Sequence, residues 1–168
     1  VKSDENFLSA EISEHGYPHV VVKGKAEIFK EKQRAEVLYE ITEGPYVEMG
    51  DIHVVGNFRT KSKVVHEELT VQKGEPFSLI KMLETQRNIR NINAFETARI
   101  KPIGLKEKAE KVNLLVEVEE KKPYSFQASI GYDTSRRFYA NTRIGDLNLF
   151  GLNKDAWAGL EVSELGER

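Results

Sequence analysis

The sequence predicts an α/β protein of the α+β type, in which two helices pack on a three-stranded mixed sheet and further antiparallel strands follow. Two helical patterns, residues 62–69 and 79–91, each carry their apolar residues on one side and are too short to be stable without a sheet. An alternating strand around Ile52 precedes them and two strands follow, which gives the order strand, helix, helix, strand, strand. The last strand has apolar residues at every second position: Val112, Leu114, Val116 and Val118.

The ends of these elements follow from the local sequence. Gly56 and Asn57 predict a turn after the first strand. Thr60 is expected to cap the first helix and Ser78 the second. Asn93 is expected to end the second helix, because Asn accepts the left-handed conformation more readily than most residues with a side chain.

The strand at 112–118 is predicted to be the centre of the sheet. Each of its four apolar side chains would contribute about 1.5 to 3 kcal/mol of transfer free energy if buried. The strand at 97–103 is less apolar and contains Pro102, which has no N–H to donate, so we expect it at an edge. Leu115 is the one apolar residue on the outward face of the central strand.

The residues before Gly50 repeat part of this pattern. A helical spacing from Asn6 to His15 ends at Gly16, and two strands at 19–29 and 34–42 follow. An offset of 77 residues brings the helix, its end and both strands into register with the later unit. The first copy therefore lacks a first strand, a first helix and part of its core. The offset pairs Gly16 with Asn93, Ile12 with Ile89, Leu38 with Leu115, Glu40 with Glu117, Ile41 with Val118 and Glu43 with Glu120, and the turn between the two early strands is Lys30, Glu31, Lys32 and Gln33.

Composition argues against several classes of function. A net charge of -2 with interleaved Lys and Glu predicts no nucleic-acid partner, and the absence of Cys excludes disulfides and thiolate metal sites. No apolar run is long enough for a transmembrane helix. The sequence has no phosphate-binding loop or nucleophile motif, so we expect no enzyme and no cofactor. The histidines at 15, 19, 53 and 66 have no ligand spacing, so we expect no metal site.

The segment from Pro123 to Arg168 alternates apolar and polar residues in runs typical of outer-membrane barrel strands. A closed barrel needs at least about 8 strands, so we expect this segment to hold only the first strands of an incomplete barrel. The apolar positions are Phe126, Ala128, Ile130 and Tyr132, then Phe138, Ala140, Thr142 and Ile144, then Ala156, Ala158, Leu160 and Val162.

Ordered motifs support one family. They are Ile52-x-Val54-x-Gly56-Asn57-x-x-Thr60, Glu68-Leu69, Gly74-x-x-Phe77, Asn93-Ala94-Phe95-x-x-Ala98-x-Ile100 and the strand from Leu114 to Glu120. This set, over about residues 6–121, resembles the POTRA (polypeptide-transport-associated) domain, although the usual Gly-Tyr-Phe after the second helix is Asn93-Ala94-Phe95 here. Gly131-Tyr132-Asp133-Thr134 and Asp146-Leu147-Asn148-Leu149-Phe150-Gly151 look like the start of the bacterial surface antigen barrel.

The resemblance implies three regions: residues 1–45 as the C-terminal part of a preceding POTRA domain, 46–122 as a complete one and 123–168 as the first barrel strands. It also implies an outer-membrane protein of the Bam or Tam type from a Gram-negative-type bacterium, with its POTRA part in the periplasm. The implied function is to assemble or translocate β-barrel or secreted clients. The implied partners are unfolded outer-membrane or secreted proteins, periplasmic or lipoprotein accessory subunits, and outer-membrane lipid.

The implied mechanism is strand addition at an exposed sheet edge. We expect the client-binding edge at Thr97, Ala98, Arg99, Ile100 and Lys101, because this strand is the least apolar and the strand around Ile52 leads directly from the preceding repeat. Arg99→Pro is expected to remove one main-chain donor from this edge. The simpler interpretation, that the edge is merely exposed to solvent, stays open.

Two other interpretations also stay open. A structural POTRA module of a cell-division or other envelope scaffold complex would have a single POTRA unit after a transmembrane helix. A small enzyme of ferredoxin-like fold would need a charged or nucleophilic constellation. The repeat and the barrel-like segment favour the assembly or translocation function over both.

Overall fold

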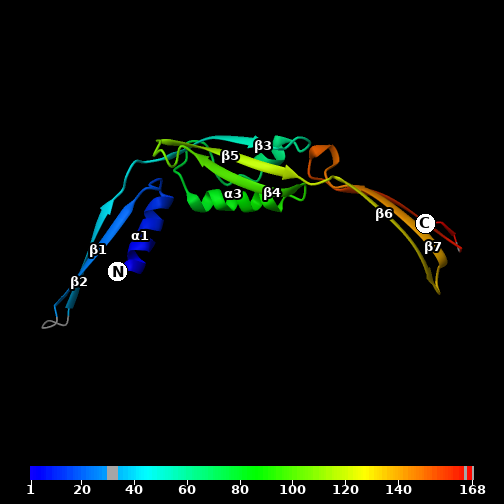
Figure 1. The fold of residues 1–168 in the computed structure, drawn as a ribbon, viewed down its shortest axis with the longest axis horizontal. Helices are drawn as coiled ribbons and strands as arrows, with labels where there is room; N and C mark the ends of the chain where they lie inside the picture. The colour runs from blue at the N-terminus through cyan, green and yellow to red at the C-terminus, as the bar shows by residue number, and fades with distance from the viewer. Residues whose placement is uncertain (30–33, 165, 168) are drawn as a thin grey trace. The chain divides into compact units, whose positions relative to one another are not determined.

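The computed structural model describes residues 1–29, 34–164 and 166–167 (Figure 1). The charged turn predicted at Lys30 to Gln33 lies outside these residues. The chain divides into two compact units, and their boundaries cut through the strands of one sheet, so the predicted domain bounds stay a prediction. The first unit is Val1–His53, Leu69–Arg87 and Arg99–Glu117, and the second is Val54–Glu68, Asn88–Ala98 and Val118–Arg168.

The three-stranded sheet consists of β3 (Glu48–Val55), β4 (Phe95–Ile103) and β5 (Lys111–Glu120), in the order β3-β5-β4. The predicted central strand and the predicted edge strand are therefore confirmed. Contacts between β3 and β5 progress in the same direction along both strands, from Glu48 N–H with the carbonyl of Glu110 (2.8 Å) to Gly56 beside the carbonyl of Val118. The two strands are thus parallel, and the sheet is mixed.

Helices α2 (Ser62–His66) and α3 (Leu79–Asn91) follow β3, and α3 has the predicted bounds, whereas α2 ends earlier than predicted. Ser78 is the predicted cap, and its hydroxyl accepts the N–H of Lys81 (3.1 Å). The prediction that Thr60 caps α2 is wrong. The helix begins after Lys61 without a side-chain cap, because Thr60 is buried and bonded elsewhere.

The prediction of a left-handed residue at Asn93 is also wrong. Asn93 is not among the described residues with positive φ. The chain instead leaves α3 through a tight turn closed by the N–H of Phe95 and the carbonyl of Ile92 (3.1 Å). This turn needs no left-handed residue, whereas Gly16, its counterpart at the end of the earlier helix, does have a φ of +95°.

The first copy of the repeat consists of α1 (Lys2–Glu14), β1 (Val21–Phe29) and β2 (Arg34–Thr42). The offset of 77 converts the bounds of α1 into those of α3, as the repeat predicts. No residue of α1 is buried, and Phe7, Ile28 and Leu38 are each about 70% exposed. This copy therefore lacks part of its core, as expected from its missing strand and helix.

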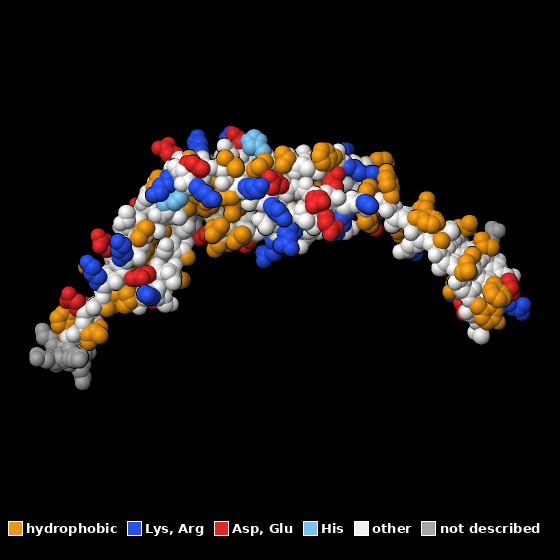
Figure 2. All heavy atoms as spheres, viewed as in Figure 1, with side chains coloured by type: hydrophobic (Ala, Val, Ile, Leu, Met, Phe, Trp, Pro, Cys, Tyr) orange, Lys and Arg blue, Asp and Glu red, His pale blue; other side chains and the backbone are white. Residues whose placement is uncertain are grey.

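The four-stranded sheet is formed by β6 (Tyr124–Asp133), β7 (Arg137–Asp146), β8 (Ala156–Ser163) and β9 (Gly166–Glu167), in that order, with a 3-10 helix η2 (Leu149–Gly151) between β7 and β8. The strands are antiparallel, and their register places the predicted apolar positions on one face. Apolar side chains gather along this sheet in Figure 2. The paired residues include Phe126 with Ile144, Ile130 with Ala140, Tyr132 with Phe138, and Thr142 with Leu160.

Candidate functional site

All five residues of the predicted site lie on β4, an edge strand of the three-stranded sheet. Ala98 and Ile100 are buried, and Thr97, Arg99 and Lys101 are exposed, so the strand alternates as a half-buried edge should. The structure therefore places the predicted residues together on one edge.

A hydrogen bond to Gln86 of α3 shows which N–H groups of β4 point away from β5. Its side-chain oxygen accepts the N–H of Ile100 (3.3 Å). Because successive N–H groups of a strand point to opposite sides, the N–H of Arg99 is directed toward β5. The expectation that Arg99→Pro removes an edge donor is thus wrong, since the substitution would break the ladder with β5 instead.

Side chains on the exposed face of β4 connect it to β5. Lys101 forms an ion pair with Glu117 (2.8 Å), and the hydroxyl of Thr97 lies 3.5 Å from the carboxylate of Glu119. Arg99 forms no ion pair with any described residue. Among the described residues, only Gln86 forms a hydrogen bond to the outward main chain of Thr97 to Lys101.

The opposite edge of the sheet is occupied by the chain itself. The turn before α3 donates from Phe77 N–H to the carbonyl of Val47 (2.9 Å), and the N–H of Met49 donates to the carbonyl of Glu75 (2.8 Å). The first half of β3 consequently has no free main chain for an added strand. The sequence predicted that β3 would be covered, but by the preceding repeat; here residues 74–77 cover it.

A second cluster, missed at the sequence level, lies within the second unit. Arg59, in the loop before α2, donates to Asp146 (2.6 Å) and to the hydroxyl of Tyr124 (2.7 Å). Its guanidinium carbon lies 4.8 Å from the centroid of the Tyr124 ring. The bond to Tyr124 raises the pKa of Arg59, and the charge of Asp146 adds to this effect against partial desolvation.

Glu120, at the end of β5, binds the main chain of the loop that contains Arg59. Its carboxylate accepts the N–H of Thr60 (2.6 Å) and the N–H of Arg59 (3.0 Å). Burial alone would raise the pKa of Glu120, but the hydrogen bonds from Thr60 and Arg59 outweigh it and lower the pKa. Glu120 is therefore a charged carboxylate that fixes the loop.

Buried polar groups complete this cluster. Asn148 donates from Nδ2 to the hydroxyl of Thr60 (2.8 Å), and both residues are buried. Lys61 N–H donates to the carbonyl of Gly151 (2.9 Å), where a side chain would collide with the main chain of Arg59. We call Arg59, Thr60, Glu120, Asp146, Asn148 and Gly151 the joint cluster.

Only an indirect signal of the joint cluster is present in the sequence motifs. Thr60, Asp146, Asn148 and Gly151 are all members of the motifs quoted above, but a motif does not tell which residue another one contacts. Sequence reasoning instead assigned Thr60 to the helix next to it in the chain. Its hydrogen-bond partner, Asn148, follows 88 positions later.

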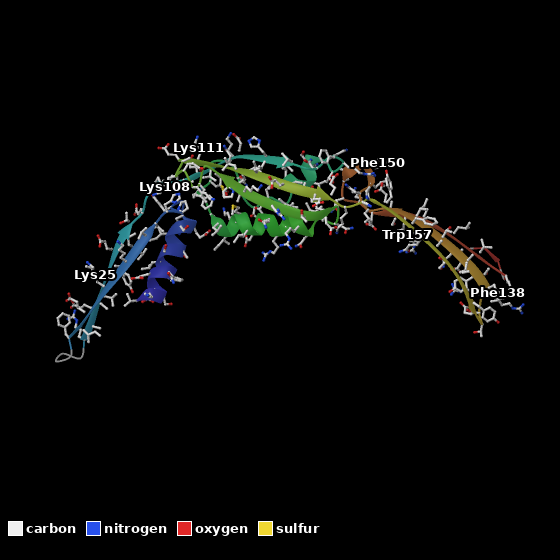
Figure 3. The ribbon with its side chains drawn as sticks, viewed as in Figure 1. Lys25, Lys108, Lys111, Phe138, Phe150 and Trp157 are labelled. Carbon is white, nitrogen blue, oxygen red and sulfur yellow. The ribbon has the colours of Figure 1, made fainter. Side chains whose placement is uncertain are left out.

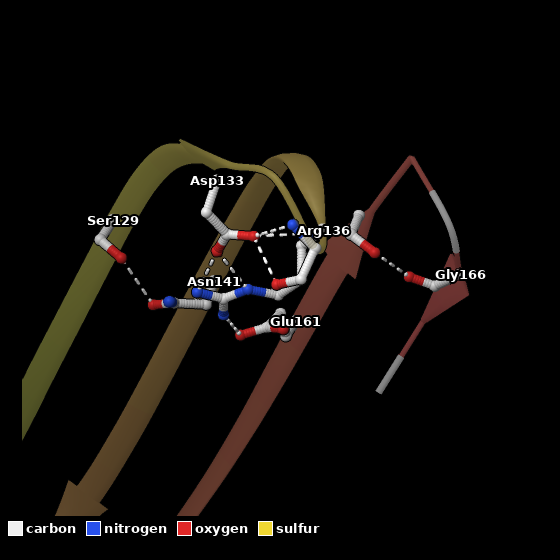
Figure 4. A network of polar contacts seen from close by, with 8 residues as sticks. Ser129, Asp133, Arg136, Asn141, Glu161 and Gly166 are labelled. Atoms are coloured by element: carbon white, nitrogen blue, oxygen red, sulfur yellow. Dashed lines mark hydrogen bonds and ion pairs between the residues drawn. The ribbon is translucent and has the colours of Figure 1, made fainter.

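The polar face of β6–β8 carries its own network (Figure 4). Arg136 binds Asp133 through Nη2 (2.6 Å) and Glu161 through Nη1 (3.0 Å), and its guanidinium carbon lies 3.9 Å from the centroid of the Tyr139 ring. Ser129 donates to Asn141 (2.9 Å). Polar side chains on this face thus satisfy one another, while the apolar face has no such partners.

No group of three His, Asp or Glu side chains in residues 1–29, 34–164 and 166–167 could hold a metal ion. Within the same ranges, no helix combines the length and apolar character that crossing a membrane requires.

The region that contains β3, β4 and β5 matches a known protein family. Residues 47–121 match the family model of POTRA, described as a surface antigen variable number repeat. The chain is 24% identical over 168 residues to the outer membrane protein assembly factor BamA of Nitratidesulfovibrio vulgaris, a match that covers 100% of this chain and 21% of the relative. BamA of Neisseria meningitidis serogroup B is 23% identical over 126 residues, or 75% of this chain and 16% of the relative. The chain thus spans about a fifth of the length of these curated relatives.

Solved structures share the fold. The crystal structure of BamA from Haemophilus ducreyi lacking POTRA domains 1–3 aligns with a TM-score of 0.72 at 16% identity, over 96% of this chain and 30% of that chain. CdiB from Escherichia coli aligns with a TM-score of 0.51 at 13% identity, over 95% of this chain and 29% of that chain. The α+β domain and the antiparallel strands that follow it therefore occur together in both proteins.

Proposed function

We propose that the chain, whose residues 47–121 match the POTRA family model, belongs to a POTRA-containing outer-membrane protein of the bacterial surface antigen type. In this proposal it is a periplasmic scaffold that binds client proteins by strand addition. The clients would be unfolded outer-membrane or secreted proteins that the parent protein assembles or translocates. We further propose that residues 1–45, 46–122 and 123–168 are the end of a preceding POTRA domain, a complete one and the first strands of a barrel.

The observation that carries the proposal is the open edge of β4. Its main chain is exposed at an edge, whereas residues 74–77 cover the first half of the β3 edge. A strand added at β4 would replace Gln86 as the acceptor for Ile100 and continue the ladder outward. Main-chain hydrogen bonds do not depend on side-chain identity, so such an edge suits clients of many sequences.

The POTRA domain lies in the periplasm, and the protein belongs to the outer membrane. The curated relatives are named outer membrane protein assembly factors, which supports a role without catalysis. Periplasmic or lipoprotein subunits, and outer-membrane lipid at β6–β8, are the partners that we propose. A structural envelope module would not account for the exposed apolar face of β6–β8.

Titration of the isotope-labelled chain with a peptide that copies an outer-membrane strand tests the proposal. The amide resonances of Thr97 to Lys101 and the side-chain amide of Gln86 should shift. Shifts near Ile52 with Thr97 to Lys101 unmoved would contradict the assignment. A peptide of the same length with Pro at alternate positions, which cannot form a ladder, is the matched control and should leave the spectrum unchanged.

Gln86→Ala sharpens the same experiment. It frees the Ile100 N–H, so the peptide should bind about fivefold more tightly, which corresponds to about one hydrogen bond. Gln72→Ala is the control, because it makes the same change at an exposed position where the side chain forms no hydrogen bond with any described residue, whereas Gln86 is half-buried. Equal affinity of the two variants would show that Gln86 does not occupy the client site.

A further inference from the structure

Two exposed aromatic side chains come from loops that are bonded to each other. Phe58, in the loop between β3 and α2, is 97% exposed, and Phe150 of η2 is 75% exposed (Figure 3 labels Phe150). The loops are connected by the hydrogen bond from Lys61 to Gly151. A large apolar side chain left in water forgoes the free energy that its burial would contribute, so two of them on loops that are bonded to each other indicate a contact surface.

Both side chains are presented by ordered backbone. Glu120 holds the N–H of Arg59, next to Phe58, and Asn57 donates to the carbonyl of Thr60 (3.0 Å). Phe150 has a φ of +55°, in the left-handed region that residues with a side chain rarely adopt. The joint cluster therefore maintains an unfavourable backbone conformation that leaves Phe150 outside.

The two loops lie where the apolar face of β6–β8 begins. Arg59 contacts Tyr124, the first residue of β6, and the apolar face continues to Tyr132. The eight steps from Tyr124 to Tyr132 span about 27 Å along the strand. At the strand tilt of about 40° found in outer-membrane barrels, this length covers a height of about 20 Å, which is most of the apolar band of about 25 Å between the two aromatic girdles. The loops are consequently at the level at which a membrane would end.

The charges around the loops suit a phospholipid surface. Lys61, Lys122 and Lys154 are exposed and form no ion pair with any described residue. All three belong to the second unit, as do Phe58 and Phe150. Apolar side chains combined with free lysines are the chemistry that binds a membrane interface, with ammonium groups at the lipid phosphates.

We infer that Phe58 and Phe150 insert into the phospholipid leaflet next to Tyr124, while the lysines contact its phosphates. The loop before α2 is then a membrane contact of the POTRA domain itself, separate from the client edge on β4. This inference depends on the proposed membrane position of β6–β8, and it does not depend on client binding.

Single labels test this contact, because the chain has no cysteine of its own. A fluorophore is attached at Phe58→Cys or Phe150→Cys in the full chain, which is mixed with phosphatidylethanolamine and phosphatidylglycerol vesicles that contain brominated lipid. Both labels should be quenched. The matched control is Phe7→Cys on α1, which is also exposed (68%) and should not be quenched. Phe58→Ser should lower vesicle partitioning about tenfold, and Phe7→Ser should not change it.

A third label separates this inference from the proposed function. Ile130→Cys reports on the apolar face of β6, where Ile130 is 88% exposed. Quenching at 130 without quenching at 58 and 150 would overturn the lipid contact and leave the membrane position of the sheet intact. Absence of quenching at all three positions would overturn both.

Discussion

Strands β5 and β6 have the same alternating sequence pattern and opposite surroundings. Along β5 the alternate residues Val112 to Val118 are between 0% and 7% exposed, and they form the centre of a core. Along β6 the corresponding residues Phe126 and Ile130 are 71% and 88% exposed. The difference teaches that alternation determines a strand and its two faces, but not what covers the apolar face. In β5 the cover comes from the same domain, and in β6 we propose that it is lipid.

The largest effect is expected from placing a carboxylate on each apolar face. Val116→Asp puts an unpaired charge at a fully buried position of β5, so it should cost several kcal/mol of unfolding free energy and unfold the domain. Ile130→Asp introduces the same group on β6, where water already surrounds it, and should leave the thermal midpoint unchanged. Thermal melts by circular dichroism measure both.

Leu115→Asp is the control within β5, because Leu115 lies on the opposite face and is only half-buried. Its midpoint should fall much less than that of Val116→Asp. Equal destabilisation by the two β5 variants would show that the faces are assigned wrongly. Destabilisation by Ile130→Asp as large as that by Val116→Asp would remove the difference between the sheets.

A smaller effect should follow from a change in the joint cluster, which bonds the loop before α2 to the end of β7 and to the residues around η2. Gly151 has a φ of +72°, and an added Cβ would lie 2.2 Å from the carbonyl oxygen of Arg59. Gly151→Ala should therefore destabilise the second unit by about 2 kcal/mol or more, as cleavage by protease between Asp146 and Ala156 would reveal.

Gly74→Ala is the matched control for this variant. Gly74 also has a positive φ (+86°), but nothing lies within 4 Å of an added Cβ. Only the strain of the left-handed backbone conformation remains, so Gly74→Ala should lower the free energy of unfolding by about 1 kcal/mol. If both variants are cleaved equally between Asp146 and Ala156, the close contact of residue 151 with Arg59 does not stabilise the joint cluster.

The smallest effect is expected from a change of pH on the stability of the loop that Glu120 binds. The pKa of Glu120 is lowered in the folded state, so its contribution to stability is present above the pKa of the unfolded chain and is lost as pH falls through the folded-state value. Acidification below about pH 4 should loosen the loop of Arg59 and Thr60, as amide exchange of these residues would show. Glu120→Gln should abolish this pH dependence. A loop whose exchange is independent of pH in both proteins, after correction for intrinsic rates, would contradict the assignment.

The sequence predicts most of the fold because the pattern of each element is local. The bounds of α3, the central position of β5 and the apolar face of β6–β8 follow from spacing alone. The prediction for Thr60 was wrong because its partner, Asn148, lies far away in the chain. Asn93 was misjudged because a tight turn can end a helix without a left-handed residue.

The same local reasoning predicts which strand is the candidate edge. It does not predict which main-chain groups of that strand point outward. That β4 is an edge strand follows from its composition and Pro102. Which N–H groups point outward depends on register, and the position of Gln86 opposite Ile100 depends on how α3 packs. Neither can be read from one sequence.

Hydrogen exchange of the whole chain in water and in detergent micelles tests the contrast between the sheets most directly. The amides of Val112 to Val118 should be strongly protected in both solvents, because β5 is central in its sheet and covered. The amides of Phe126 to Tyr132 should exchange rapidly in water and become protected in micelles, which can cover their apolar face. Protection of Phe126 to Tyr132 in water equal to that of Val112 to Val118 would contradict the account.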